Sequence, residues 1–181
     1  MPLAIISVGA ADALQRSLPH LHECLERPIV TLEGIALLKH DGRLLEPTPT
    51  VDETSGEPGL WQTLGIYTRE TAQVDGRTLY TELTRRLREA GAAGATTIRG
   101  EWGFSSDEPP HGDKLGCFAS HARTYTVYID RPSKVAELWP IVDEMTTEHG
   151  IVTSLLVPGY RERADGVANG RLPRFERPVT G

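Results

Sequence analysis

The chain has 181 residues, of which 39% are apolar and 24% charged, as in globular rather than disordered proteins. Its net charge of −6 argues against broad binding to nucleic acid, which usually needs a basic excess. No apolar stretch approaches the roughly 20 residues that span a bilayer, and the apolar start lacks the basic flank of a signal peptide. Cys24 and Cys117 are too few for a disulfide framework, so we expect free thiols in a reducing cytoplasm.

Two stretches rich in proline and glycine divide the chain. Residues 43–60 contain three prolines and two glycines, and residues 161–181 contain two prolines and three glycines. Such compositions are typical of segments without regular structure. We therefore expect a segment at 1–42, a linker at 43–60, a complete module at 61–160 and a disordered tail at 161–181.

The first half of the 61–160 segment predicts a strand, a helix and a strand. Residues 64–67 form a short apolar run. Residues 77–90 carry Leu79, Leu83 and Leu87 at four-residue steps, which predicts an amphipathic helix, and glycines then end it. Residues 95–99 predict the next strand, and a polar loop with glycine and proline follows over residues 100–116.

The second half of the segment repeats this order. Residues 125–129 are β-branched and aromatic and predict a strand. Asp130 or Ser133 is expected to cap a helix whose apolar positions are Val135, Leu138, Val142 and Met145. Gly150 ends this helix, and residues 151–157 predict the fourth strand. The order β-α-β-β-α-β predicts an α+β, ferredoxin-like fold, with an antiparallel sheet and two helices on one face.

Residues 1–42 resemble the second half of that module. Residues 5–27 align with residues 126–148 at a constant offset of 121, which places Pro19 on Pro140. Ile-Val-Thr at 29–31 then falls on the same tripeptide at 151–153, with one extra residue in the later copy. We interpret this as an internal repeat, so that a β-α-β half-module precedes the complete one. A half-module has too little core to be stable alone, so either it docks elsewhere or a missing upstream portion completes it.

The string G-A-T-x-x-R-G-x-x-G-F at residues 94–104, following the helix that contains Leu79 and Leu83, resembles a bacterial family known only as domain of unknown function 190. The resemblance covers about residues 62–160. It implies a PII-like fold, similar to that of PII signalling proteins and CutA proteins, and a cytoplasmic homotrimer. Genes of this family often lie near those of fluoride channels, so a membrane channel or transporter is an implied partner.

The resemblance implies a non-enzymatic regulatory or sensor protein. It would bind a small anion, a nucleotide or a partner protein at subunit interfaces and signal through the 100–116 loop. The turn at residues 146–150 has one glycine and an acidic residue, which makes it a poor phosphate cradle of the PII kind. The alternative is a metal-binding or enzymatic protein on the same fold, similar to CutA. The residues identify no cofactor.

The best candidate ligand site is the turn that follows the strand at 95–99. Its glycines allow close backbone approach, its aromatic residues can stack on a ring, and its arginine can pair with an anion. A purely structural role, with the aromatic residues packed under the loop or between subunits, is the competing interpretation. The candidate ligand-binding residues, including two from the loop, are Arg99, Gly100, Trp102, Gly103, Phe104, His111 and Lys114.

Metal binding and catalysis have weaker support. His111, Asp113, Cys117 and His121 are the only cluster with metal-ligating residue types, but glycines interrupt the segment. The sequence has no G-x-S-x-G elbow and no P-loop pattern. His20 and His22, two residues apart, and the adjacent acids Asp143 and Glu144 are expected on solvated surfaces.

Overall fold

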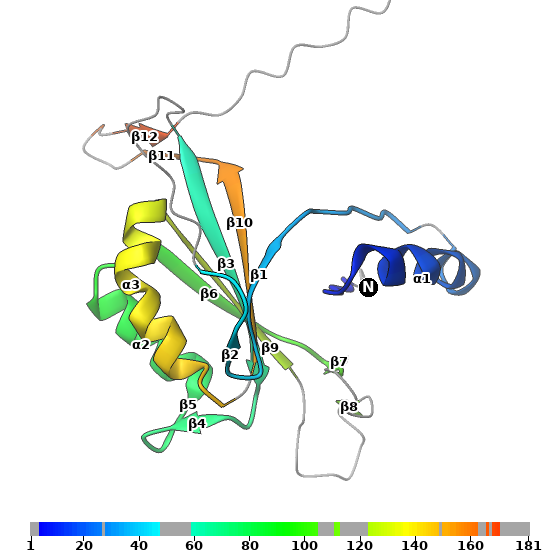
Figure 1. Cartoon of the computed structure of the whole chain (residues 1–181), viewed down its shortest axis with the longest axis horizontal. Coiled ribbons are helices and arrows are strands. Elements are labelled where there is room, and N and C mark those ends of the chain that lie inside the picture. Colours follow the sequence, from blue (N-terminus) through cyan, green and yellow to red (C-terminus); the bar gives the residue numbers. More distant parts are fainter. Residues whose placement is uncertain are drawn as a thin grey trace, which may run out of the picture. The chain divides into compact units, whose positions relative to one another are not determined.

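The computed structural model of the chain describes residues 4–26, 28–47, 59–104, 111–112, 123–148, 150–162, 166 and 168–170. The chain forms two compact units, Met1–Gly34 and Ile35–Gly181. In the described residues the fold is mixed α+β, with three helices and a mainly antiparallel sheet (Figure 1). This agrees with the α+β class predicted from the sequence.

The first unit contains helix α1 (Ala11–Cys24). This helix and α3 (Pro132–Met145) are each 14 residues long, both contain an internal proline, and they begin 121 residues apart, as the proposed repeat requires. The alignment of the half-module with β9 and β10 implies strands at 5–8 and 29–31, but the described residues there form no strand. A strand is stable only when its backbone groups find a partner strand, and apolar composition does not supply one.

The second unit is built on a six-stranded sheet in the order β2-β1-β10-β3-β9-β6, and neighbouring strands in it are antiparallel. Four of these six strands were predicted from the sequence, and each is longer than predicted. The bounds of the six strands are β1 Ala36–His40, β2 Arg43–Leu44, β3 Leu60–Arg69, β6 Gly94–Arg99, β9 Arg123–Asp130 and β10 Ile151–Pro158.

Helix α2 (Leu79–Glu89) and α3 cover the same face of this sheet (Figure 1). All seven apolar helix positions predicted from the periodicity are buried. They pack in one core cluster with strand residues that include Leu64, Ile66 and Tyr128. Since residues alternate between the two faces of a strand, the residues between these point to the opposite face.

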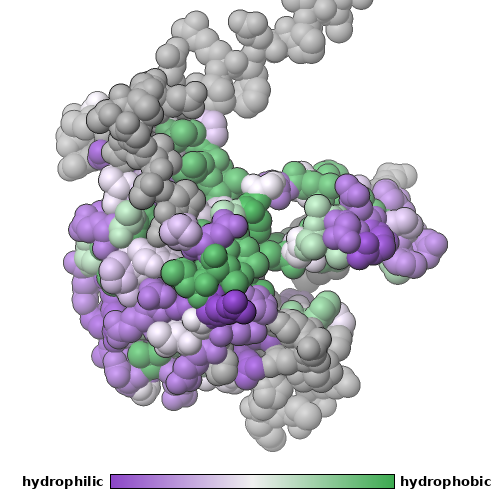
Figure 2. Space-filling view, in the orientation of Figure 1, coloured by the Kyte–Doolittle hydropathy of each residue, from purple (hydrophilic) through white to green (hydrophobic). Residues whose placement is uncertain are grey.

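That opposite face, which neither α2 nor α3 covers, is called the open face below. By strand register it carries residues that are mainly β-branched, aromatic or basic. In Figure 2 the surface over the two helices is largely polar, whereas apolar surface follows the sheet. The open face includes Tyr67, Arg69, Thr96, Ile98, Arg123, Tyr125, Val127, Ile129, Ile151, Leu155 and Val157.

Strand β1 belongs to the second unit, although the sequence grouped it with the first. It pairs with β10, its Leu38 is fully buried in the core, and a register shift lies between Leu37 and Lys39. Lys39 is 2% exposed, and its Nζ donates to the carbonyl oxygen (2.8 Å) and to Oδ1 (2.5 Å) of Asp143 on α3. This contact, in which the lysine is buried and the aspartate half-exposed, connects β1 to the helix layer.

Two Asp-Gly hairpins were missed in the sequence. Asp41 and Gly42 join β1 to β2, and Asp75 and Gly76 join β4 (Gln73–Val74) to β5 (Arg77–Thr78). All four residues have positive φ, from 45° to 78°, as a two-residue hairpin turn of type I′ requires. Consequently β2 lies in the stretch expected to be a linker, and the second helix begins at residue 79 rather than 77.

The start of α3 and the tail also differ from the prediction. Neither Asp130 nor Ser133 caps the helix; the N-cap is Arg131, with no side-chain hydrogen bond, and Pro132 follows with its backbone preset for a first helical turn. The Asp130 side chain instead accepts from the backbone N–H groups of Ala93 and Arg131. The first part of the expected tail forms a strand pair, β11 (Tyr160–Glu162) with β12 (Ala168–Gly170).

Among the described residues, none of the helices combines the length and the apolar character needed to cross a bilayer.

Candidate functional site

The turn predicted as the ligand site follows β6 and leads into β7 (Trp102–Gly103). Its first glycine, Gly100, donates its backbone N–H to the carbonyl oxygen of Arg123 (2.8 Å). A Cβ on Gly100 would approach that same oxygen to 3.1 Å, tighter than most real contacts, so a side chain here would crowd the bond. β7 then pairs with β8 (His111–Gly112), which folds the start of the loop into a short hairpin.

Arg99, the predicted anion-binding arginine, has a protein partner. Its guanidinium forms an ion pair with the carboxylate of Glu70, just after β3. By register Arg99 stands opposite Thr124, whose neighbours along β9 show that this position is on the helix-covered side of the sheet. The structure therefore places Arg99 on the face opposite to Arg123, in a contact that already neutralises its charge.

The two aromatic residues of the turn are exposed. Trp102 is 65% exposed and Phe104 is 63% exposed, whereas Trp61, elsewhere in the sheet, is 7% exposed. Within the single chain, therefore, neither ring is packed under other residues, whereas packing between subunits, the other form of the competing interpretation, stays a prediction. Large aromatic side chains left in solvent often mark a surface that binds something.

Arg123, at the start of β9, lies next to both glycines of the turn, and the sequence pattern did not identify it as a candidate. Its carbonyl oxygen holds Gly100, and its side chain lies beside Gly103, where an added Cβ would be 3.8 Å from Arg123 Cγ. Partial burial and the nearby charge of Arg69 lower the pKa of the Arg123 guanidinium, while the charge of Asp41 acts in the opposite direction. Arg123 therefore has both a positive and a negative side chain close to its guanidinium group.

Next to these arginines, two tyrosines lie stacked on the open face. Tyr67 and Tyr125 are directly paired between β3 and β9, with ring centroids 4.5 Å apart and an interplanar angle of 17°. A Cβ at Gly65 would come 2.7 Å from the Thr153 hydroxyl oxygen and 3.0 Å from the Tyr125 ring. A larger residue at 65 would therefore displace the stack, which explains why a strand interior contains a glycine.

Several candidates lie outside the residues that the structure describes. Lys114, Asp113, Cys117 and His121 are among them, and only the backbone of His111 is described. Within the described part of the chain, no three His, Cys, Asp or Glu residues are grouped to hold a metal. Cys24 is a free, exposed thiol, and His20 and His22 lie on the exposed surface of α1 as expected.

A second group of polar residues is buried under α3, away from the turn. The Tyr128 hydroxyl donates to Asp130 (3.3 Å), and burial, followed by the charge of Asp130, raises the pKa of this tyrosine. Gln62 donates to the Ser154 hydroxyl (2.9 Å), while its Oε1 has no hydrogen-bond partner. Asp130 also accepts hydrogen bonds from the backbone N–H groups of Ala93 and Arg131. These buried polar residues therefore connect the sheet to the start of α3.

Part of the chain matches a known protein family. Residues 61–158, more than half of the chain, match the model of domain of unknown function 190 (DUF190), described as an uncharacterized ACR. The match spans the sheet strands β3, β6, β9 and β10 with both covering helices, and it includes Arg69, Arg99 and Arg123. It leaves α1, β1 and β2 outside.

Proposed function

Because the chain belongs to the DUF190 family, we propose that it is a PII-like regulatory protein that binds a small anion, a nucleotide or a partner protein through the 100–116 loop. The observation that carries this proposal is the exposure of Trp102 and Phe104 at the base of that loop. Exposed aromatic side chains beside a glycine turn suit stacking on a ring or docking of a partner.

The proposed architecture is the ferredoxin-like fold of PII proteins. It is supported by the strand order β10-β3-β9-β6, in which β9 lies between the two strands that α2 connects. Likewise β3 lies between the two strands that α3 connects, so each β-α-β unit is split by one strand of the other. Strand β1 with β2 would be an addition at the β10 edge.

The proposed assembly is a cytoplasmic homotrimer, and a channel or transporter is its proposed membrane partner. The trimer is supported by the open face, where Ile98 and Ile129 are exposed and neighbouring aliphatic residues are half-buried. Burying such a face is a usual reason for self-association. Sedimentation velocity should give three times the chain mass, and Ile129→Asp should give the monomer; a monomeric wild type would overturn the trimer.

A thermal-shift panel of nucleotides, anions and divalent metals tests the binding proposal, because a ligand that binds only the folded chain raises its Tm. We expect a nucleotide or anion to raise the Tm and to change the fluorescence of Trp102. The matched variants are Trp102→Phe, which keeps an aromatic ring, and Trp102→Ser, which removes it; only the second should lose the response.

The same panel separates the alternative function. Stabilisation by zinc or copper that is lost in Cys117→Ser would favour the metal-binding alternative. If no nucleotide, anion or metal changes the Tm, small-ligand binding by this protein is contradicted, and binding of a partner protein is what the proposal retains.

A further inference from the structure

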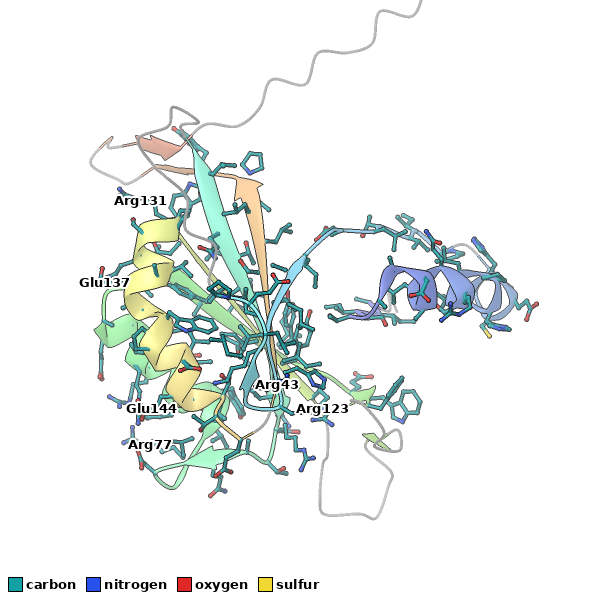
Figure 3. All side chains as sticks on the ribbon, viewed as in Figure 1. Arg43, Arg77, Arg123, Arg131, Glu137 and Glu144 are labelled. Atoms are coloured by element: carbon teal, nitrogen blue, oxygen red, sulfur yellow. The ribbon has the colours of Figure 1, made fainter. Side chains whose placement is uncertain are left out.

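The two edges of the six-stranded sheet differ in how they are protected. At one edge, β2 has only two residues, both exposed, and one of them is the charged Arg43 (Figure 3). At the other edge, β6 has six residues, and in the described part of the chain β9 is its only partner strand. Short strands and charged side chains discourage the addition of a further strand, whereas a long edge presents a row of backbone N–H and C=O groups. The edge open to a further strand is therefore β6.

The side chains of β6 suit such an addition. The strand contains no proline, its one charge lies at its end, and Thr96, Thr97 and Ile98 are all β-branched. Thr96 and Ile98 lie on the open face, and both are exposed. β-Branched residues are favoured in strands because they pack against neighbours on the adjacent strand. A strand added beside β6 would supply such neighbours on its outer side.

The stretch between α1 and β1 has the composition of a strand. Residues 29–33, Ile-Val-Thr-Leu-Glu, are bounded by Pro28 and Gly34 and form neither a helix nor a strand. Ile29 is 96% exposed and Leu32 is 62% exposed. Large apolar side chains that are exposed together indicate a surface that binds something. This stretch, called the 29–33 segment below, can form a strand, but among the described residues no strand pairs with it.

The later occurrence of its first three residues shows what they do beside partner strands. Ile151, Val152 and Thr153 begin β10 and pair with β3 on one side and with β1 on the other. Val152 is fully buried there, whereas Val30, its counterpart in the 29–33 segment, is exposed. The two tripeptides are identical, so the difference lies in the strands beside them. What the 29–33 segment lacks is a sheet edge.

We propose that the 29–33 segment of one chain adds as a strand to the β6 edge of a second copy of the chain. The β6 of the same chain is out of reach. It lies four strand spacings from β1, about 19 Å, whereas the three residues from Glu33 to Ala36 at the start of β1 span about 10 Å at most.

Each chain then donates a strand next to one edge of its sheet and accepts a strand at the other edge. Such a head-to-tail contact can close into a ring of identical chains. The inference rests on the proposed homotrimer and deepens it, because it names the segments through which neighbouring copies meet.

The direct test is chemical crosslinking between full-length chains. In a Cys24→Ser/Cys117→Ser background, one chain carries Thr31→Cys and a co-expressed second chain carries Thr96→Cys. A short bismaleimide crosslinker should join the two kinds of chain, and neither kind should be joined when it is expressed alone. Ser7→Cys, at an exposed position before α1, is the matched control for Thr31→Cys and should not be joined to Thr96→Cys.

A second variant tests the strand pairing without added cysteines. Thr31→Pro removes a backbone N–H and disfavours a paired strand, so it should weaken the assembly by about tenfold or more in sedimentation velocity, the usual loss for one or two hydrogen bonds. Ser7→Pro is the control and should assemble as the wild type does. In the wild type, the amides of the 29–33 segment should be protected from hydrogen exchange, and Thr31→Pro should abolish that protection.

The inference is overturned, and the proposed trimer retained, if the wild type is a trimer but Thr31→Cys and Thr96→Cys are not joined. It is also overturned if Ser7→Cys is joined as readily, or if Ser7→Pro weakens the assembly as much as Thr31→Pro does. A monomeric wild type overturns the trimer and this inference together. The ligand response at Trp102 tests the proposed binding function separately.

Discussion

Helices α1 and α2 have the same kind of apolar pattern but differ in burial. In α1, Leu14, Leu18 and Leu21 recur at helical spacing, yet no residue of this helix is buried. In α2, Leu83 and Leu87 recur in the same way and are completely buried against the sheet. Periodicity therefore predicts which side of a helix is apolar, whereas its burial depends on a surface that other elements must provide.

The same contrast holds for charged residues. The ion pair Arg16–Asp12 on α1 is exposed on both sides, whereas Glu82 on α2 is 3% exposed and contacts both Arg85 and Arg86. Arg86 also reaches Glu144 on α3, so the network connects the two helices. We expect charges in the second unit to affect stability more than charges in the first.

The largest difference is expected from removal of one leucine in each helix. Leu83→Ala should lower the free energy of unfolding by about 2–5 kcal/mol, because it leaves a cavity in the core. Leu18→Ala, the matched change in the half-exposed stripe of α1, should cost about 1 kcal/mol or less. Urea denaturation measures both; equal losses would mean that the α1 stripe is covered in solution.

A smaller effect is expected at the buried lysine. Asp143→Ala removes the carboxylate that pairs with Lys39 and should cost about 1–3 kcal/mol, because the ammonium group stays buried. The double variant Lys39→Met/Asp143→Ala should recover part of that loss, since no charge is then buried. Asp12→Ala is the control on α1 and should leave the denaturation midpoint unchanged. A double variant less stable than Asp143→Ala would contradict this account.

The smallest effect is a pH dependence. Hydrogen bonds from Arg85 and Arg86 hold the pKa of Glu82 well below its ordinary value. The carboxylate therefore stabilises the fold fully above about pH 4.3, the usual glutamate value, and this contribution is lost as the pH falls below it. Glu82→Gln should flatten the fall in Tm between about pH 6 and pH 3 relative to the wild type.

Glu23→Gln, at an exposed position on α1, is the control for the Glu82→Gln variant and should leave the dependence of Tm on pH unchanged. If Glu82→Gln gives the same profile as the wild type, these arginines do not lower the pKa of Glu82 in the folded state.

The main elements of the second unit could be predicted from the sequence because their apolar spacing is regular. The buried positions of α2 and α3, such as Leu83 and Val142, follow directly from that spacing. The hairpin at Asp41 and Gly42 carried a recognisable turn signal. By contrast, the absence of strands at 5–8 and 29–31 depends on pairing, which no local pattern determines.

The candidate site could be predicted only in part. The glycine turn and its aromatic residues are contiguous in the sequence, so they could be found there. Arg69 and Arg123 are 54 residues apart and meet only through the pairing of β3 with β9. Asp143 could not be predicted as a partner of Lys39, because that contact depends on adding β1 to the sheet.

Native-state amide hydrogen exchange of the intact chain tests most directly the claim that stability is concentrated in the second unit. Amides of β3, β9 and β10 should exchange slowly, near the rate set by global unfolding, and those of α1 should exchange quickly because no residue of that helix is buried. If the amides of α1 were as well protected as those of β3, the claim would be contradicted.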